Sequence, residues 1–280
     1  MMLNMEGVKK ILGRKEILKG IDAGLDAGVV GLLGANGAGK TTLIRCLTGI
    51  YDLDGGKVEY EGENITRSKT YRPQLGYLPQ AFGLFRELTV YEMMDYFCAL
   101  KKVPKGLRQA MIEECLKKVN LEDRIHARVS TLSGGMVRRV GIAQSLLGNA
   151  RIMIMDEPTS GLDPQERTRF KNMIARMKGE DRLVLISTHI VEDVESLCDR
   201  VLVMHEGRVL FSGSCEELTS RAEGMVYEVP TRVMSQIRGD YYESQIGTTH
   251  ARALCREPQN FPQLPPMLED GYMAVMKGYV

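Results

Sequence analysis

The stretch GANGAGKTT, Gly34–Thr42, decides the fold of this chain. It follows the apolar run GVVGLLG at Gly28–Gly34 and opens a segment of helical pattern at Thr41–Leu47. It matches G-x-x-x-x-G-K-[ST], a motif that needs a strand before it and a helix after it. Because both neighbours are present, a glycine-rich turn with an incidental lysine is the weaker interpretation. The stretch predicts a phosphate-binding loop between a buried strand and a helix.

The residue types of this loop suit a nucleoside triphosphate with magnesium. Glycines let backbone N–H groups converge on phosphate oxygens, and the helix N-terminus adds a favourable field. We expect Lys40 to reach the β and γ phosphates and the Thr41 hydroxyl to ligate Mg²⁺. The other residues expected to contact the nucleotide here are Gly34, Ala35, Asn36, Gly37, Ala38, Gly39 and Thr42.

Further apolar runs have the length and composition of strands buried on both faces. They are RIMIMDE at Arg151–Glu157, RLVLIST at Arg182–Thr188 and RVLVMH at Arg200–His205. Segments of helical period, such as GMVRRVGIAQSLL and QERTRFKNMIARM, alternate with them. Buried strands that alternate with helices indicate a parallel sheet, so the predicted fold class is α/β.

Three regions depart from this alternation. Residues from about 82 to 130 hold two helix-period segments and no buried-strand run, which predicts an inserted helical subdomain. The stretch around Lys57–Tyr77 holds KVEYEG and LGYLP, strand-like pieces that we expect in a small β layer beside the main sheet. Beyond about Ser220 prolines interrupt the pattern. We therefore expect a main domain over 1–220 and an accessory extension over 221–280, weakly folded or docked on the main body.

Two acidic residues, Asp156 and Glu157, end one of the apolar runs. Ligands of open α/β sheets bind beyond the carboxyl ends of the strands. We expect Asp156 to hold Mg²⁺ through water and Glu157 to face the γ-phosphate as general base. The alternative is a solvated pair of charges at a strand end.

Composition excludes several classes of protein. The 280 residues are 44% hydrophobic and 26% charged, which argues against a disordered or low-complexity chain. The formal net charge of +1 argues against a surface that coats nucleic acid. No apolar window is long enough for a membrane span and no signal peptide opens the chain, so we expect a soluble, intracellular chain. Six cysteines without a CxxC pair predict reduced thiols, with no zinc site or disulfide framework.

Four further motifs carry a family resemblance: Gln80 in YLPQ, LSGG at Leu132–Gly135, SGLD at Ser160–Asp163 and His189 in STHI. Together with GANGAGKT and IMIMDE, they occur in the order found in ATP-binding cassette (ABC) ATPases. The chain thus resembles an ABC transporter ATP-binding subunit over roughly three quarters of its length. This resemblance implies ATP as the nucleotide, and a P-loop ATPase core with an antiparallel β layer and a helical subdomain.

The resemblance also implies residue roles. Ser133, Gly134 and Gly135 would contact the γ-phosphate bound to the opposite subunit. Gln80 would link the γ-phosphate and magnesium region to the helical subdomain, with Mg²⁺ among its contacts. His189 would contact the γ-phosphate, and Asp163 would connect the two nucleotide sites.

Plainer alternatives exist for three of these motifs. LSGG is also an ordinary helix start with Ser133 as N-cap, and Asp163 is also a helix cap before Pro164. His189 could be a structural histidine at a strand end.

Two positions depart from the family pattern. Met136 follows LSGG where the family usually has glutamine. Leu12 stands where the family usually has an aromatic residue that stacks on adenine, so only an apolar contact is available there.

One chain carries one phosphate loop and one LSGG, and a composite site needs two of each, so the resemblance implies a head-to-tail dimer closed by ATP. It also implies a separately encoded membrane permease, with this chain peripheral on the cytoplasmic side of a bacterial exporter of drugs, peptides or lipids. Phe82, Leu84 and Phe85 are expected to receive a short permease helix; the alternative is that they are ordinary packing residues of the helical insertion.

Two other classes compete with this interpretation. A soluble cassette ATPase acting on nucleic acid or ribosomes would need a second cassette or long coiled coils, which the sequence lacks. A metabolic kinase would leave LSGG and SGLD unexplained. No nucleic-acid partner is expected.

Overall fold

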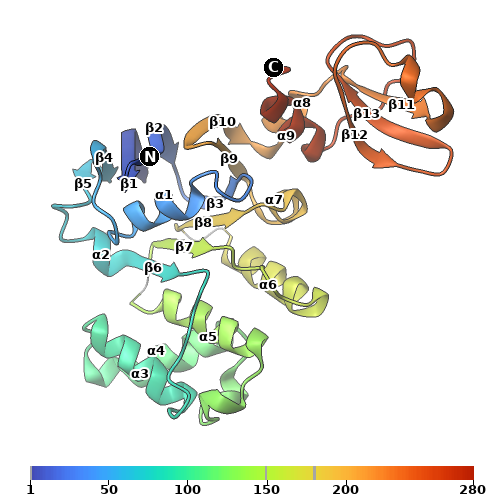
Figure 1. Cartoon of the computed structure of the whole chain (residues 1–280). Helices are drawn as coiled ribbons and strands as arrows, with labels where there is room; N and C mark the ends of the chain where they lie inside the picture. The colour runs from blue at the N-terminus through green and yellow to red at the C-terminus, as the bar shows by residue number, and fades with distance from the viewer. Residues whose placement is uncertain (1, 149, 179–180) are drawn as a thin grey trace.

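The computed structural model describes residues 2–148, 150–178 and 181–280. Its centre is a six-stranded sheet in the order β10-β9-β3-β8-β7-β6, in which only the β10–β9 pair is antiparallel (Figure 1). The strands are β3 (Gly28–Leu33), β6 (Leu75–Leu78), β7 (Ile152–Asp156), β8 (Leu183–Thr188), β9 (Arg200–His205) and β10 (Arg208–Ser214). Every residue of β7 and β8 is buried, which explains their continuous apolar sequence. The predicted α/β class with a parallel sheet is confirmed.

A second, antiparallel sheet lies beside the first, in the order β2-β1-β4-β5. Its strands are β1 (Leu3–Leu12), β2 (Lys15–Leu25), β4 (Gly55–Tyr60) and β5 (Glu63–Asn64). Helix α1 (Lys40–Leu47) packs into one hydrophobic core with both sheets through Leu43, Ile44 and Leu47. The short helix α2 (Tyr71–Gln74) leads to β6.

The position predicted for LGYLP is wrong in part. KVEYEG forms β4 of the antiparallel layer, but LGYLP supplies β6, the edge strand of the main sheet, where Leu75 pairs with Ile152 of β7. Strand β7 pairs with β8 along one edge, and LGYLP pairs in parallel with its other edge. A four-residue apolar strand carries no local mark of which sheet it will join.

Helices lie on the other side of the main sheet, the first two of them packed against each other and against the third (Figure 1). They are α3 (Val90–Leu100), α4 (Lys105–Lys118), α5 (Gly134–Leu146), α6 (Pro164–Met177) and α7 (Val191–Leu197), with 3₁₀ turns η1 (Glu122–Arg124) and η2 (Val129–Thr131). Buried residues of all five helices and of the sheet share one core. The two helices expected between about 82 and 130 are α3 and α4, and α5, which follows LSGG, packs against both.

The last part of the chain is folded. It contains α8 (Cys215–Ser220), β11 (Val226–Pro230), η3 (Thr231–Gln236), β12 (Tyr241–Ile246), β13 (His250–Cys255) and α9 (Leu268–Lys277). The sheet β11-β13-β12 has a hydrophobic cluster on each face and projects from the main body (Figure 1). Helix α9 packs on α8 and places Leu268 in the main core. The expectation of weak folding is wrong, whereas docking is seen through α9.

Candidate functional site

The glycine-rich loop lies between β3 and α1, at the carboxyl edge of the main sheet. A Cβ on Gly34 would lie 2.3 Å from the backbone oxygen of Met204 in β9, so only glycine allows this close approach. Gly39, directly before α1, has φ 106°, a left-handed conformation that L side chains rarely adopt. The loop thus turns the chain so that backbone N–H groups open at the start of α1.

Lys40 is 5% exposed, and its ammonium lies within the loop. Its Nζ donates to the carbonyl oxygens of Gly34 at 2.6 Å and Ala35 at 3.2 Å, and lies 3.6 Å from Oε1 of Glu157. Burial lowers the pKa of Lys40, and the nearby charge of Glu157 opposes that shift. The lysine is therefore held within the loop by two backbone carbonyls, beside the carboxylate expected to face the γ-phosphate.

A cavity of about 450 Å³ opens over this loop. The loop contributes Asn36, Gly37, Gly39, Lys40, Thr41 and Thr42; the rest of the lining is Lys15, Ile17, Gln80 and Glu157. The structure thus brings Gln80 and Glu157, far apart in sequence, to the phosphate loop. Leu12 at the end of β1 is 37% exposed and is not among the residues that line this cavity.

Asp156 ends β7 and is 1% exposed. Its Oδ1 accepts a 2.6 Å hydrogen bond from the hydroxyl of Ser187, while its Oδ2 has no hydrogen-bond partner among the described residues. A buried carboxylate oxygen without a donor fits a hydrated divalent cation. The hydroxyl of Thr41 and the amide oxygen of Gln80 are also the oxygen ligands that Mg²⁺ prefers, so the residues present fit that ion.

Glu157 lies at the centre of the cluster. It is 6% exposed, and its carboxylate oxygens lie 3.1 and 2.9 Å from Nδ1 of His189. Its backbone N–H donates to the hydroxyl of Ser187 at 2.9 Å. Its φ of 50° is left-handed, which is rare for a residue with a side chain and recurs at functional sites. The Glu157 carboxylate therefore lies against both Lys40 and His189.

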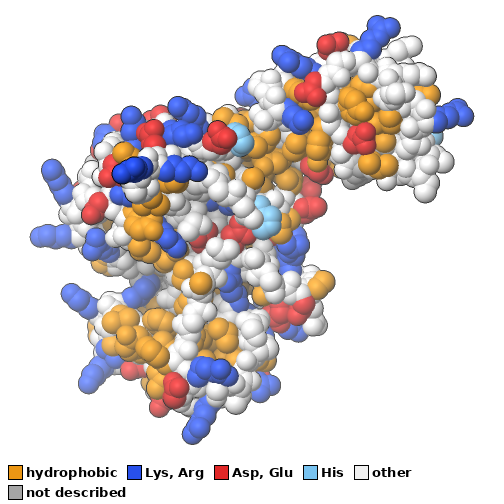
Figure 2. All heavy atoms as spheres, in the orientation of Figure 1, with side chains coloured by type: hydrophobic (Ala, Val, Ile, Leu, Met, Phe, Trp, Pro, Cys, Tyr) orange, Lys and Arg blue, Asp and Glu red, His pale blue; other side chains and the backbone are white. Residues whose placement is uncertain are grey.

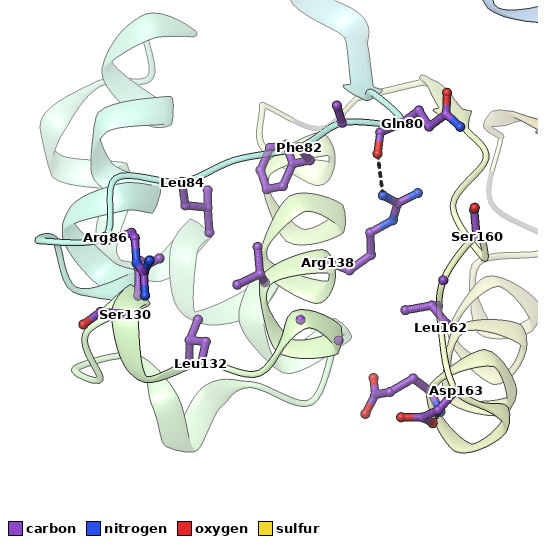
Figure 3. Close-up of a pocket in the computed structure, with 17 residues that line it drawn as sticks. Gln80, Phe82, Leu84, Arg86, Ser130, Leu132, Arg138, Ser160, Leu162 and Asp163 are labelled. Carbon is purple, nitrogen blue, oxygen red and sulfur yellow. Dashed lines mark hydrogen bonds between the residues drawn. The ribbon is translucent and has the colours of Figure 1, made fainter.

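Sequence reasoning missed Arg138. This side chain of α5 donates Nη1 to the carbonyl oxygen of Gln80 at 2.9 Å (Figure 3). Its Nε donates to the carbonyl oxygen of Pro158 at 3.0 Å, and its Nη2 donates to that of Glu157. Burial lowers the pKa of the Arg138 guanidinium, and the charges of Asp156 and Glu157 oppose that shift. The only hint in the sequence is a pair of arginines one and a half turns into the helix that LSGG opens.

LSGG begins α5 as a capped helix. The Ser133 side chain accepts from the backbone N–H of Met136 at 3.2 Å. A Cβ on Gly134 would meet nothing within 4 Å, whereas one on Gly135 would lie 2.7 Å from Cγ of Glu166. Gly134 and Gly135 line a different cavity, of about 580 Å³, together with Gln80 and residues 160–163 (Figure 3). None of the described LSGG residues lines the cavity over the chain's own phosphate loop.

SGLD leads into α6. Asp163 caps that helix, because its Oδ1 accepts from the backbone N–H of Glu166 at 2.8 Å. Ser160, Gly161, Leu162 and Asp163 line the same 580 Å³ cavity as Gly134 and Gly135. Both motifs therefore have the capping geometry considered above, and neither lines the cavity over the chain's own phosphate loop.

Comparisons with known proteins agree with this site. The family model described as ABC transporter matches residues 18–160, which is half of the chain and includes the loop, Gln80, LSGG and Glu157. The chain belongs to the ABC transporter ATP-binding family. As an ABC ATPase it binds and hydrolyses ATP.

Curated relatives of this ABC ATPase are ATP-binding proteins. It is 35% identical to linearmycin resistance ATP-binding protein LnrL of Bacillus subtilis (strain 168), over 80% of this chain and 72% of the relative. It is 33% identical to Nod factor export ATP-binding protein I of Paraburkholderia xenovorans (strain LB400), over 97% and 95%. The solved structure of cbiO1 from Clostridium perfringens, part of an ABC transporter complex, matches with a TM-score of 0.71 and 29% identity, over 78% of this chain and 90% of that one.

The family assignment resolves one alternative. A metabolic kinase is excluded, because one ABC transporter family model covers both the phosphate loop and LSGG, and a kinase would leave LSGG unexplained. Met136, the departure after LSGG, is half-buried and packs against the main core, so its side chain serves the fold of this ABC ATPase.

Proposed function

We propose that this ABC ATPase energises an exporter, in which ATP closes two copies of the chain head to tail and hydrolysis reopens them. One observation carries the proposal: within one chain, the phosphate loop and the LSGG helix start line two separate cavities. The two cavities share only Gln80 among their described lining residues, so each chain holds two distinct half-sites. A second copy supplies the missing half of each site.

Within such a composite site each residue has a distinct task. The loop N–H groups and Lys40 bind the phosphates, while Ser133, Gly134 and Gly135 of the second copy approach the γ-phosphate from the opposite side. The positive end of α5 suits that anion. Asp163, exposed at the start of α6, lies beside the same cavity as Gly134 and Gly135 and thus near the dimer contact.

The catalytic end of the site is the contact of Glu157 with His189. Glu157 accepts the proton of the attacking water, and its contact with Nδ1 of His189 fixes the carboxylate while the exposed histidine ring contacts the γ-phosphate. Thr41, Gln80 and Asp156 would hold Mg²⁺, which would supply neutralisation of charge on the transferred phosphate. Burial of Glu157 among Lys40 and His189 excludes bulk water from the carboxylate.

In this proposal the permease binds at the part of the 580 Å³ cavity lined by Phe82 and Leu84, and the second copy binds at the part lined by Gly134, Gly135 and Asp163. Phe82 and Leu84 line the cavity, and Phe85 beside them is 54% exposed and contacts Tyr96 edge to face at 5.8 Å. Figure 2 shows hydrophobic side chains on the surface of this helical part of the molecule. Gln80 lines this cavity and the nucleotide cavity, so an occupant of one can influence the other.

The proposals of export and of membrane association are supported by the names of relatives. Those named above act in linearmycin resistance and Nod factor export, and another is a daunorubicin resistance protein of Streptomyces coeruleorubidus. Among the described residues, no helix combines the length and apolar character needed to cross a bilayer. We propose that this chain lies peripherally on the cytoplasmic side of the membrane, bound to a separate permease.

We also propose that the chain consists of two parts with different roles. Residues 1–220 form the ATPase unit, with the helical subdomain at about 82–130, and residues 221–280 form an accessory extension. The separate sheet that begins at Val226 and has its own clusters supports this division.

The Glu157→Gln variant with Mg·ATP on a sizing column tests the dimer. Because that variant binds ATP without a general base, we expect a stable ATP-dependent dimer. The Glu157→Gln, Lys40→Ala double variant should remain monomeric, since it lacks the phosphate contact. A monomer under every nucleotide condition, even with permease present, would overturn the composite site.

A further inference from the structure

Arg138 joins two segments that carry catalytic side chains. Its three hydrogen bonds go to the carbonyl oxygen of Gln80 and to those of Glu157 and Pro158. Gln80 follows β6 and Glu157 follows β7. The guanidinium of Arg138 therefore sets the distance between the segment that carries Gln80 and the segment that carries Glu157.

The backbone at Glu157 needs such support. Its left-handed φ of 50° is unfavourable for a residue with a side chain, so surrounding contacts must maintain it. Ser187 holds the N–H of Glu157 at 2.9 Å from the β8 side, and Arg138 holds the carbonyl from the α5 side. The direction of the Glu157 side chain depends on both contacts, because they fix the two peptide planes that flank its Cα.

Only an arginine makes this set of bonds. A guanidinium offers five N–H donors in a rigid plane, whereas a lysine ammonium is a single point charge on a flexible stem. The next residue, Arg139, donates to the carbonyl oxygens of Val119 at 3.3 Å and Asn120 at 2.8 Å, within the helical subdomain. Two successive arginines thus make similar bonds to carbonyls, but only Arg138 reaches the site.

Two other side chains, one from α5 and one from the end of α3, donate hydrogen bonds to β6. Gln144 of α5 donates to the carbonyl oxygen of Tyr77 at 2.6 Å, and Lys101 at the end of α3 donates to that of Leu75 at 3.3 Å. These carbonyls belong to alternate residues of an edge strand and point away from β7. Arg138 makes a similar bond to the carbonyl oxygen of Gln80, two residues beyond the end of β6. A shift of α5 therefore moves the segment that leads into the nucleotide cavity.

We propose that Arg138 is a positioning residue: it orients the Glu157 carboxylate and the Gln80 amide, and it couples the helix opened by LSGG to the general base of its own chain. The inference rests on the proposed roles of Glu157 and LSGG. Since Ser133 begins the helix that carries Arg138, docking of the LSGG segment on the second copy's nucleotide changes the geometry of the first copy's carboxylate. Each nucleotide site thereby senses the other through α5.

Turnover of Arg138→Lys measures the positioning role, with Arg139→Lys as the matched control. We expect kcat of Arg138→Lys to fall about tenfold to a hundredfold with KM for ATP changed less than about threefold, because the carboxylate is displaced and the phosphate loop is not. Arg139→Lys should keep kcat within about twofold. Equal kcat for wild type and Arg138→Lys would overturn the proposal.

A double-variant cycle shows whether Arg138 acts through Glu157. If it does, adding Arg138→Lys to Glu157→Gln lowers the residual single-turnover rate by less than about twofold, because the affected group is already gone. A further drop as large as in the wild-type background would mean that Arg138 acts by another route.

Hydrogen exchange provides a readout independent of activity. In Arg138→Lys we expect faster exchange at the amides of Ser160 and Leu162, which bond to the carbonyls of Glu157 and Thr159, with protection of α5 retained. Loosening of α5 itself would indicate a merely structural role and contradict the proposal. These measurements need no sizing column, so a failed dimer assay and a failed positioning role are distinguishable.

Discussion

Thr159 donates a 2.7 Å hydrogen bond from Oγ1 to Oδ2 of Asp193, and this bond ties the loop after β7 to helix α7. Asp193 is 1% exposed, and its Oδ1 lies 3.5 Å from Nε of Arg167 and 3.4 Å from Nζ of Lys171. Helix α7 begins two residues after His189. The segment that presents SGLD is thus anchored to the helix that follows the site histidine.

Replacing Asp193 should therefore weaken both fold and turnover. We expect Asp193→Ala to lower the free energy of unfolding by about 2 to 3 kcal/mol, because a buried acceptor is lost and two cations lose their partner. Urea unfolding followed by circular dichroism measures this. The control Glu195→Ala, on the exposed face of the same helix, should change stability by less than about 0.5 kcal/mol.

The Gly134→Ala variant tests the phosphate contact of LSGG without disturbing the fold. A Cβ at this helix start meets nothing within 4 Å, so we expect unfolding stability equal to wild type or slightly higher. The same Cβ would stand between the helix N-terminus and a γ-phosphate on a second copy, and ATP hydrolysis should fall at least about tenfold. Full activity together with normal stability would argue against a phosphate contact at LSGG.

The Gly34→Ala variant should lose both stability and ATP binding, because the added Cβ clashes within the fold. Its Cβ would lie 2.3 Å from the backbone oxygen of Met204, so β9 or the loop must shift. We expect a loss of stability of about 1 to 3 kcal/mol and weaker ATP binding, measured by thermal unfolding and titration with a fluorescent ATP analogue. Gly83→Ala, where a Cβ meets nothing within 4 Å, is the matched control and should resemble wild type in both assays.

Lys101 predicts a pH dependence of stability. Burial lowers its pKa from 10.5 to about 8, although its Nζ donates to the carbonyl oxygens of Leu75 and Leu147. Between about pH 8 and 10.5 the unfolded chain holds a proton that the folded chain has released, so this group makes stability rise with pH there, by at most about 1.4 kcal/mol per pH unit. Below pH 8 both states are protonated and its contribution is constant.

The Lys101→Met variant checks that sign. Urea unfolding at pH 8 and pH 10 should show a larger stability deficit of the variant, relative to wild type, at the higher pH. A deficit that shrinks as the pH rises would contradict the burial effect.

Charges at the apolar surface test the permease proposal. We expect Leu84→Glu and Phe85→Glu to reduce co-purification with the permease and to uncouple ATP hydrolysis from transport, because both side chains are apolar beside the 580 Å³ cavity. Phe85→Glu is the cleaner variant, since Phe85 is 54% exposed and its loss leaves the core intact. Unchanged co-purification of both variants would count against this surface.

The local sequence around Gly34–Thr42 determined the phosphate loop, because glycines, lysine and threonine at fixed spacing are readable without neighbours. The buried strands were equally readable, since every residue of β7 and β8 is covered and apolar composition follows directly. Asp156 and Glu157 could be placed near the loop, because parallel strands end at one edge of a sheet, whereas His189 was placed there only by the family resemblance.

Tertiary structure alone decided three further features. LGYLP joined the main sheet because β7 offered a free edge, and edge pairing has no local pattern. Residues beyond Ser220 fold because three short strands and α9 bury one another's apolar faces. Arg138 reaches Gln80 and Glu157 because the rotation of α5 against the sheet points it there and turns Arg139 away. The direction of a side chain depends on how whole elements pack, and that is set by the sum of contacts far apart in sequence.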